Sequence, residues 1–123
     1  MTLNNECVRD LLLWVEKNQT LDSAGKPNPI HLKRIYSEFL YSQSDINTAA
    51  QYLVEKKILK LPEGRTTSGL APRAYVFCGI TALGYDYIAA VKDDTIWKKI
   101  KSRLGAVTLA SVPAVIELSS KLL

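Results

Sequence analysis

Apolar residues recur at helical spacing in the first segment of the chain. Between residues 3 and 17, four of them follow the i, i+3, i+4, i+7 pattern of one helix face: Val8, Leu11, Leu12 and Val15. Thr2 or Asn4 can cap the start of this helix. Residues 18–28 then collect Asn, Asp, Ser, Gly and Pro, which favour turns, so we expect a loop there.

Two further helices are expected close together after this loop. The pattern predicts a second helix over residues 29–40, with Pro29 as its first residue. A short turn at residues 41–43 leads to a third helix, which we expect to begin at the N-cap Ser44 and to continue to about Lys57. Two short helices joined by a turn form a helix-turn-helix arrangement.

The pattern changes to that of strands after the third helix. Residues 58–61 alternate apolar and basic side chains, and residues 74–80 are rich in the aromatic and β-branched types that fit a pleated surface. Residues 62–73 between them have the composition of a turn. The prediction is a two-stranded hairpin with a long tip, and three helices followed by a hairpin is the order of a winged helix-turn-helix core.

Helical spacing returns in the C-terminal third of the chain. Thr81 can cap a fourth helix, a fifth is expected over residues 95–104 before Gly105, and Ser111 and Pro113 open a last one. The predicted fold is therefore mainly α with a small β-hairpin. It has a winged helix-turn-helix core at residues 1–81 and a C-terminal helical extension at residues 82–123.

Length and composition favour one globular domain in a reducing compartment. At 123 residues, two separate cores would be too small to be stable, and the apolar share of 47% and charged share of 23% are ordinary for a globular protein. Cys7 and Cys78 lie in apolar segments and match neither a disulfide framework nor a metal site. No apolar leader or membrane span is apparent, so we expect a cytoplasmic protein with no membrane contact.

The net charge favours an anionic partner only weakly. Sixteen Lys and Arg stand against twelve Asp and Glu, which gives +4. In a recognition helix the exposed Asn47, Thr48 and Gln51 can reach base edges. However, residues 42–55 contain no Lys or Arg, and the first cations are Lys56 and Lys57. A polar helix face without a nucleic-acid role is the competing interpretation.

Two other groups of cations can contact phosphates. Arg65 and Arg73 lie in the expected hairpin tip, which is equally typical of a solvated loop. The fifth helix carries the strongest cluster, and this cluster suits a nucleic acid, an acidic protein surface or a solvated helix end. Trp97 on the same helix is expected in the core. The cluster consists of Lys98, Lys99, Lys101 and Arg103.

No set of residues indicates catalysis. His31 is the only histidine, and the sequence has no glycine-rich phosphate loop and no Cys and His spacing for a metal. We expect Cys7 and Cys78 to be buried and inert. The adjacent Asp93 and Asp94 are better explained as a helix start than as an acid/base pair. The prediction is a protein without enzyme activity, catalytic residues, bound metal or cofactor.

Three segments together carry a resemblance to a known family. They are the helix Cys7-Val-Arg-Asp-Leu-Leu-Leu-Trp-Val-Glu, residues 45–59, and residues 80–101 with their Lys-Asp-Asp-Thr-Ile-Trp run. They resemble a family of uncharacterised winged-helix proteins of bacteria and prophages. Its members open on a Val-Arg-Asp-Leu-Leu type of helix and close on an Asp-Asp-Thr-x-Trp signature. The resemblance implies the fold and a mobile-element origin, but no catalytic residue. The segment over residues 21–41 is longer and more polar than the corresponding segment expected for the family.

Three hypotheses about function follow. The first is a non-catalytic winged-helix module of phage or mobile-element origin that binds nucleic acid or a nucleoprotein, with Asn47, Thr48 and Gln51 in a groove. The second is an anti-CRISPR protein that blocks a host effector nuclease, because a recognition helix without cations suits a protein partner. The third is a homodimer through the last helix, whose apolar row is Val115, Ile116, Leu118 and Leu122.

Overall fold

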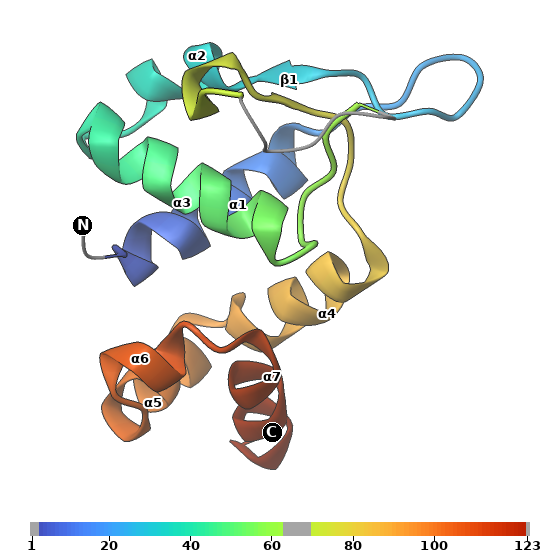
Figure 1. Ribbon diagram of the computed structural model, residues 1–123. Helices are drawn as coiled ribbons and strands as arrows, with labels where there is room; N and C mark the ends of the chain where they lie inside the picture. Colours follow the sequence, from blue (N-terminus) through green and yellow to red (C-terminus); the bar gives the residue numbers. More distant parts are fainter. Residues whose placement is uncertain (1–2, 63–69, 123) are drawn as a thin grey trace.

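The structure is a computed structural model that describes residues 3–62 and 70–122 (Figure 1). It confirms a mainly helical fold with a small antiparallel sheet, and it does not contradict a winged helix-turn-helix core. The elements are α1 (Asn5–Asn18), β1 (Ile30–His31), α2 (Leu32–Ile35), the 3-10 turn η1 (Tyr36–Glu38), α3 (Gln43–Glu55), the 3-10 turn η2 (Pro72–Ala74), β2 (Val76–Phe77), α4 (Ala82–Val91), α5 (Asp94–Arg103), α6 (Ala106–Leu109) and α7 (Val112–Leu122).

The centre of the core is the contact between α1 and α3. The side chain of Asn4 caps α1 by accepting a hydrogen bond from the backbone N–H of Cys7 at 3.1 Å, as the sequence predicts. Figure 1 shows α1, α2, α3 and the sheet together in the upper part of the view and α5, α6 and α7 below, with α4 between them. The buried residues that line the contact are Val8, Leu11, Leu12, Val15, Ile46, Ala49, Ala50 and Leu53.

The predicted helix over residues 29–40 is wrong over most of its length. Ile30 and His31 form β1 and pair antiparallel with Phe77 and Val76, and only four residues of α2 and the turn η1 follow. The backbone N–H of Leu32 also donates to the carbonyl of Tyr75. These pairings join residues more than 40 positions apart, so the local apolar spacing does not reveal them.

The third helix begins earlier than predicted. Ser42, not Ser44, is the N-cap of α3, because its hydroxyl accepts the backbone N–H of Asp45 at 3.0 Å. The helix ends at Glu55, and Lys57 then takes a left-handed conformation with φ of 62°. This turn directs the chain back into the core at Ile58, whose N–H donates to the carbonyl of Leu53.

The predicted hairpin exists only in part. Leu59 forms an isolated antiparallel bridge with Ile80, supported by hydrogen bonds between Lys60 and the backbone of Cys78 and Gly79. Of the predicted second strand, Ala74 ends η2, and Val76 and Phe77 form β2, which pairs with β1 instead of with residues 58–61. Arg65 and the rest of residues 63–69 lie outside the described residues.

The C-terminal helices start as the sequence predicts, within one or two residues. Thr81 caps α4 and Asp93 caps α5. The sequence pattern did not predict the short helix α6. The helix α7 packs on α4 and α5, and this contact uses its apolar row: Val115 is buried, and Ile116, Leu118 and Leu122 are packed against the core. A homodimer through this row stays a prediction. Within residues 3–62 and 70–122, no helix has the length and apolar character needed to cross a membrane.

Candidate binding surfaces and the network that positions them

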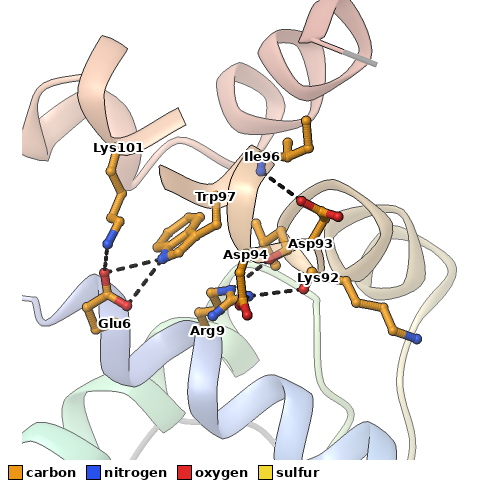
Figure 2. A network of polar contacts seen from close by, with 9 residues as sticks. Glu6, Arg9, Lys92, Asp93, Asp94, Ile96, Trp97 and Lys101 are labelled. Carbon is orange, nitrogen blue, oxygen red and sulfur yellow. Dashed lines mark hydrogen bonds and ion pairs between the residues drawn. The ribbon is translucent and has the colours of Figure 1, made fainter. Parts of the chain in front are cut away.

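Arg9 fastens α1 to the turn between α4 and α5 (Figure 2). Its side chain is almost completely buried, with 8% of the residue exposed. Nε donates to the carbonyl of Val91 at 2.7 Å, and Nη2 donates to the carbonyl of Lys92 at 3.0 Å and to Oδ1 of Asp94 at 2.6 Å. The buried guanidinium therefore satisfies two backbone carbonyls that α4 leaves unpaired at its C-terminal end.

Glu6 forms the second half of this network, one turn earlier on α1. Its carboxylate accepts a hydrogen bond from Nε1 of Trp97 at 3.2 Å and forms an ion pair with Lys101. The guanidinium of Arg9 and the ammonium of Lys101 each lie 5.6 Å from the centroid of the Trp97 ring. Trp97 is 2% exposed, so the prediction that it belongs to the core is confirmed.

The two adjacent acids serve the structure, as predicted. Asp93 caps α5 through a 2.9 Å hydrogen bond from the backbone N–H of Ile96, and Asp94 in the first turn pairs with Arg9. Their carboxylates thus have separate partners and do not form an acid/base pair.

The outward face of α3, with the cations that flank it, is the first candidate binding surface. We call it the α3 surface, and its three uncharged polar side chains already have hydrogen-bond partners in the chain. Asn47 accepts a hydrogen bond from the hydroxyl of Tyr36, and Gln51 donates to Oε1 of Glu55 at 3.0 Å. Thr48 donates to the carbonyl of Ser44 at 2.9 Å. The described residues of this surface are Asn47, Thr48, Gln51, Lys56, Lys57 and Arg73.

The cations of the α3 surface lie at its edges. Lys56 and Lys57 are exposed at the C-terminal end of α3, and Arg73 is exposed on η2, which contacts both α2 and α3. The structure thus brings Arg73 beside the helix-turn-helix pair, as the first hypothesis requires. Sequence reasoning missed Tyr36, which joins η1 to α3, because no spacing rule connects a 3-10 turn to a residue 11 positions later.

The second candidate surface lies on α5 and is smaller than the sequence suggests. Lys98, Lys99 and Arg103 are exposed on one side of the helix. Lys101 points the other way and is paired with Glu6. The predicted cluster of four cations is therefore one structural lysine and three free cations, and we call these three the α5 face.

A family model described as "Hypothetical protein (DUF2513)" matches residues 2–110. The chain belongs to this family. No curated protein and no solved structure is significantly similar to the chain. The match to DUF2513 runs from the start of α1 to the end of α6, so it includes both halves of the network in Figure 2 and both candidate surfaces. The family is uncharacterised, so membership in DUF2513 assigns no activity.

Neither cysteine of this DUF2513 chain has the environment of a reactive thiolate. Cys7 is buried, and burial together with the nearby carboxylates of Asp45 and Asp10 raises its pKa to about 12. Cys78 is half-buried rather than buried as predicted, and desolvation raises its pKa as well. In the part of the chain that the structure describes, no three His, Cys, Asp or Glu side chains are grouped so that they could hold a metal ion.

The network makes the stability of the DUF2513 fold depend on pH through Glu6. Burial by itself raises the pKa of Glu6, but the hydrogen bonds from Lys101 and Trp97 and the charges of Lys101 and Arg9 outweigh it, so the pKa lies below its ordinary value. A carboxylate whose pKa is lower in the folded protein than in the unfolded chain stabilises the fold at pH values above its ordinary pKa. This contribution is lost as the pH falls through the pKa that the group has in the folded protein.

We therefore expect the free energy of unfolding to fall as the pH drops below the ordinary range of a glutamate, and the Glu6→Gln variant to show a smaller fall. Urea unfolding from about pH 6 to about pH 3 measures this difference. Parallel curves for the two proteins would show that Glu6 does not carry the dependence. Glu117→Gln is the control, because Glu117 pairs only with Lys121 on the exposed side of α7.

Proposed function

We propose that this DUF2513 chain is a non-catalytic winged-helix module that binds duplex DNA in the cytoplasm of a bacterial host, and that it comes from a phage or a related mobile element. The fold supports this through the order of three helices and a small sheet, in which α3 takes the position of a recognition helix. The segments around Arg9 and Asp94, which carry the resemblance to prophage winged-helix proteins, support the proposed origin. In our proposal these two segments are a structural signature, because they bind each other rather than a ligand.

The observation that carries the proposal is the position of three cations around one polar helix. Arg73 on η2 and the pair Lys56 and Lys57 flank α3 and are exposed, and guanidinium and ammonium groups in such positions hold phosphates. In this arrangement the phosphates supply most of the affinity.

Reading of base edges is the weaker part of the contact. Gln51 must release Glu55 before it can pair with a base, and the amide oxygen of Asn47 already accepts the Tyr36 hydroxyl. A side chain that gives up one hydrogen bond to form another gains little, because only the difference between the two contributes. We therefore propose binding with low sequence specificity.

A salt titration tests this function. We expect the wild-type protein to bind a duplex of about 20 base pairs with an affinity that falls steeply with salt. The Lys56→Ala, Lys57→Ala, Arg73→Ala triple variant loses three phosphate contacts. The slope of log K against log salt, which is negative, should therefore become less steep by about 2 to 3. Fluorescence anisotropy with a labelled duplex measures both quantities.

The control for this experiment removes three exposed lysines elsewhere. Lys17, Lys26 and Lys92 lie outside both candidate surfaces. Among the described residues, Lys92 alone of the three forms a side-chain ion pair, with Glu16 at 3.7 Å. We expect the triple alanine variant at these positions to bind nearly as the wild type does. Affinity that is independent of salt, or an equal loss in both variants, would contradict phosphate binding by the α3 surface.

One observation favours the second hypothesis, a protein partner. From Ser42 to Glu55 the chain has no cation, and Glu55 is exposed on the outward side of α3. Because a recognition helix without cations also suits a protein surface, an anti-CRISPR protein that blocks a host CRISPR effector nuclease such as Cas9 is the second candidate function. Target cleavage by the purified nuclease in the presence of excess protein tests it: inhibition supports an anti-CRISPR function, and normal cleavage removes it.

A further inference from the structure

The helix α5 carries a cationic surface that binding through α3 does not use. Lys98, Lys99 and Arg103 are exposed and lie within an arc of about 140° around the helix. Residues 95–103 contain no acid, and Asp94 at the helix start is engaged by Arg9. Among the described residues, no Asp or Glu side chain forms an ion pair with any of these three cations.

The stability of α5 does not account for this surface. Cations in the last turn of a helix stabilise its negative end, and this explains Lys101 and Arg103. Lys98 and Lys99 lie before the last turn, where the effect of the helix dipole has largely disappeared. The one lysine that contributes to packing, Lys101, is directed toward Glu6 and Trp97 instead.

The α5 face is also held rigidly on the body of the protein. Trp97 and Ile100 on the opposite side of α5 are buried, and Trp97 is hydrogen-bonded to Glu6 of α1. Arg9 fixes the start of the helix through Asp94 and two backbone carbonyls. Three cations are therefore presented from one fixed helix, which lowers the entropic cost of binding a regular array of anions.

We propose that the α5 face is a second contact for the phosphate backbone of the duplex, separate from the α3 surface. Lys98 and Arg103 are five residues apart, or about 7 Å along the helix axis, which is of the same order as the spacing of charges along a DNA strand. An acidic protein fits less well, because protein interfaces are enriched in aromatic and apolar anchors and depleted in lysine. The apolar residue next to Arg103 on this helix, Ile96, is half-buried against the core. The inference rests on the proposed function. It adds the α5 face as a surface that supplies much of the electrostatic affinity of the protein for the duplex.

The experiment compares four proteins on the same labelled duplex over a range of salt. They are the wild type, the α5 variant (Lys98→Ala, Lys99→Ala, Arg103→Ala), the α3 variant with Lys56, Lys57 and Arg73 replaced by alanine, and the control variant at Lys17, Lys26 and Lys92. We expect the α5 variant to bind at least about tenfold more weakly than the control at moderate salt. The slope of its log K against log salt should be less steep than that of the control by about 2 to 3. Its thermal unfolding should stay close to that of the wild type, because all three side chains are exposed and only Arg103 lies in the last turn, where an exposed charge contributes little to helix stability.

The outcomes separate this inference from the proposed function. If only the α3 variant is weakened, the α5 face is not a contact and the proposed function stands. If only the α5 variant is weakened, the α5 face is the contact and the α3 surface is not. If the wild type does not bind the duplex, or binds it independently of salt, both are overturned. A Lys98→Arg, Lys99→Arg variant that keeps its affinity would further support a contact by charge.

Discussion

The Arg9→Ala variant is expected to lose about 3 kcal/mol of the free energy of unfolding. The substitution removes three hydrogen bonds and leaves the buried carbonyl of Val91 and the part-buried carbonyl of Lys92 without the guanidinium. It also removes the cation next to the Trp97 ring. Urea unfolding measures the loss, and the melting temperature should fall by roughly 10 °C.

The control for this prediction is Asp94→Asn, which removes the ionic part of the contact alone. The side chain of Asp94 is 85% exposed, so its ion pair with Arg9 is screened by water, and we expect a loss below about 1 kcal/mol. Equal losses in the two variants would show that the ion pair, and not the pair of backbone carbonyls, holds the C-terminal helices on α1. Hydrogen exchange of the amides around residues 92–97 reports the same contact independently.

The second large effect is expected from Gly84→Ala, although alanine is the better helix former. A Cβ atom at this position would lie 2.5 Å from the backbone carbonyl oxygen of Ile58 and 2.6 Å from Cγ2 of Ile80. The helix α4 must therefore move away from the bridge between Leu59 and Ile80. We expect a net loss of about 2 kcal/mol, because the overlap outweighs the gain in helix propensity.

Gly105→Ala is the matched control. A Cβ atom at Gly105 meets nothing within 4 Å, so this variant should differ from the wild type by less than about 0.5 kcal/mol. Urea unfolding of the two variants side by side measures the effect of the close approach at Gly84. If Gly84→Ala were as stable as Gly105→Ala, then α4 would not be held tightly against Ile58.

Local signals predicted the ends and the buried faces of most helices. The caps of α1, α4 and α5, provided by Asn4, Thr81 and Asp93, are in the sequence because a cap and its partner are three residues apart. The cap of α3 was placed two residues late, since Ser42 and Ser44 are chemically equal candidates. The helix expected over residues 29–40 was wrong because β1 depends on a strand far along the chain.

The sequence predicted which residues belong to the candidate surfaces. It did not predict how these residues are grouped in space or which of them are paired. Lysine and arginine in α5 are visible in the sequence, yet only the fold separates Lys101, which binds Glu6, from the cations that remain free. Arg9 was not selected as a structural residue, because arginine is rarely buried unless it is paired and its partners cannot be read from the local sequence. Its partner Asp94 is 85 residues away, and no local pattern connects them.

The sequence by itself determined what depends on neighbours within one or two turns: the helical class, the capped starts of α1, α4 and α5, and the apolar faces that form the core. The tertiary structure decided what depends on distant residues: the pairing of β1 with β2, the placement of Arg73 beside α3, and the division of the α5 cations into one paired lysine and three free charges. The physical reason is that periodicity and capping act over three or four residues, whereas ion pairs and strand pairing depend on which segments the packed core brings together.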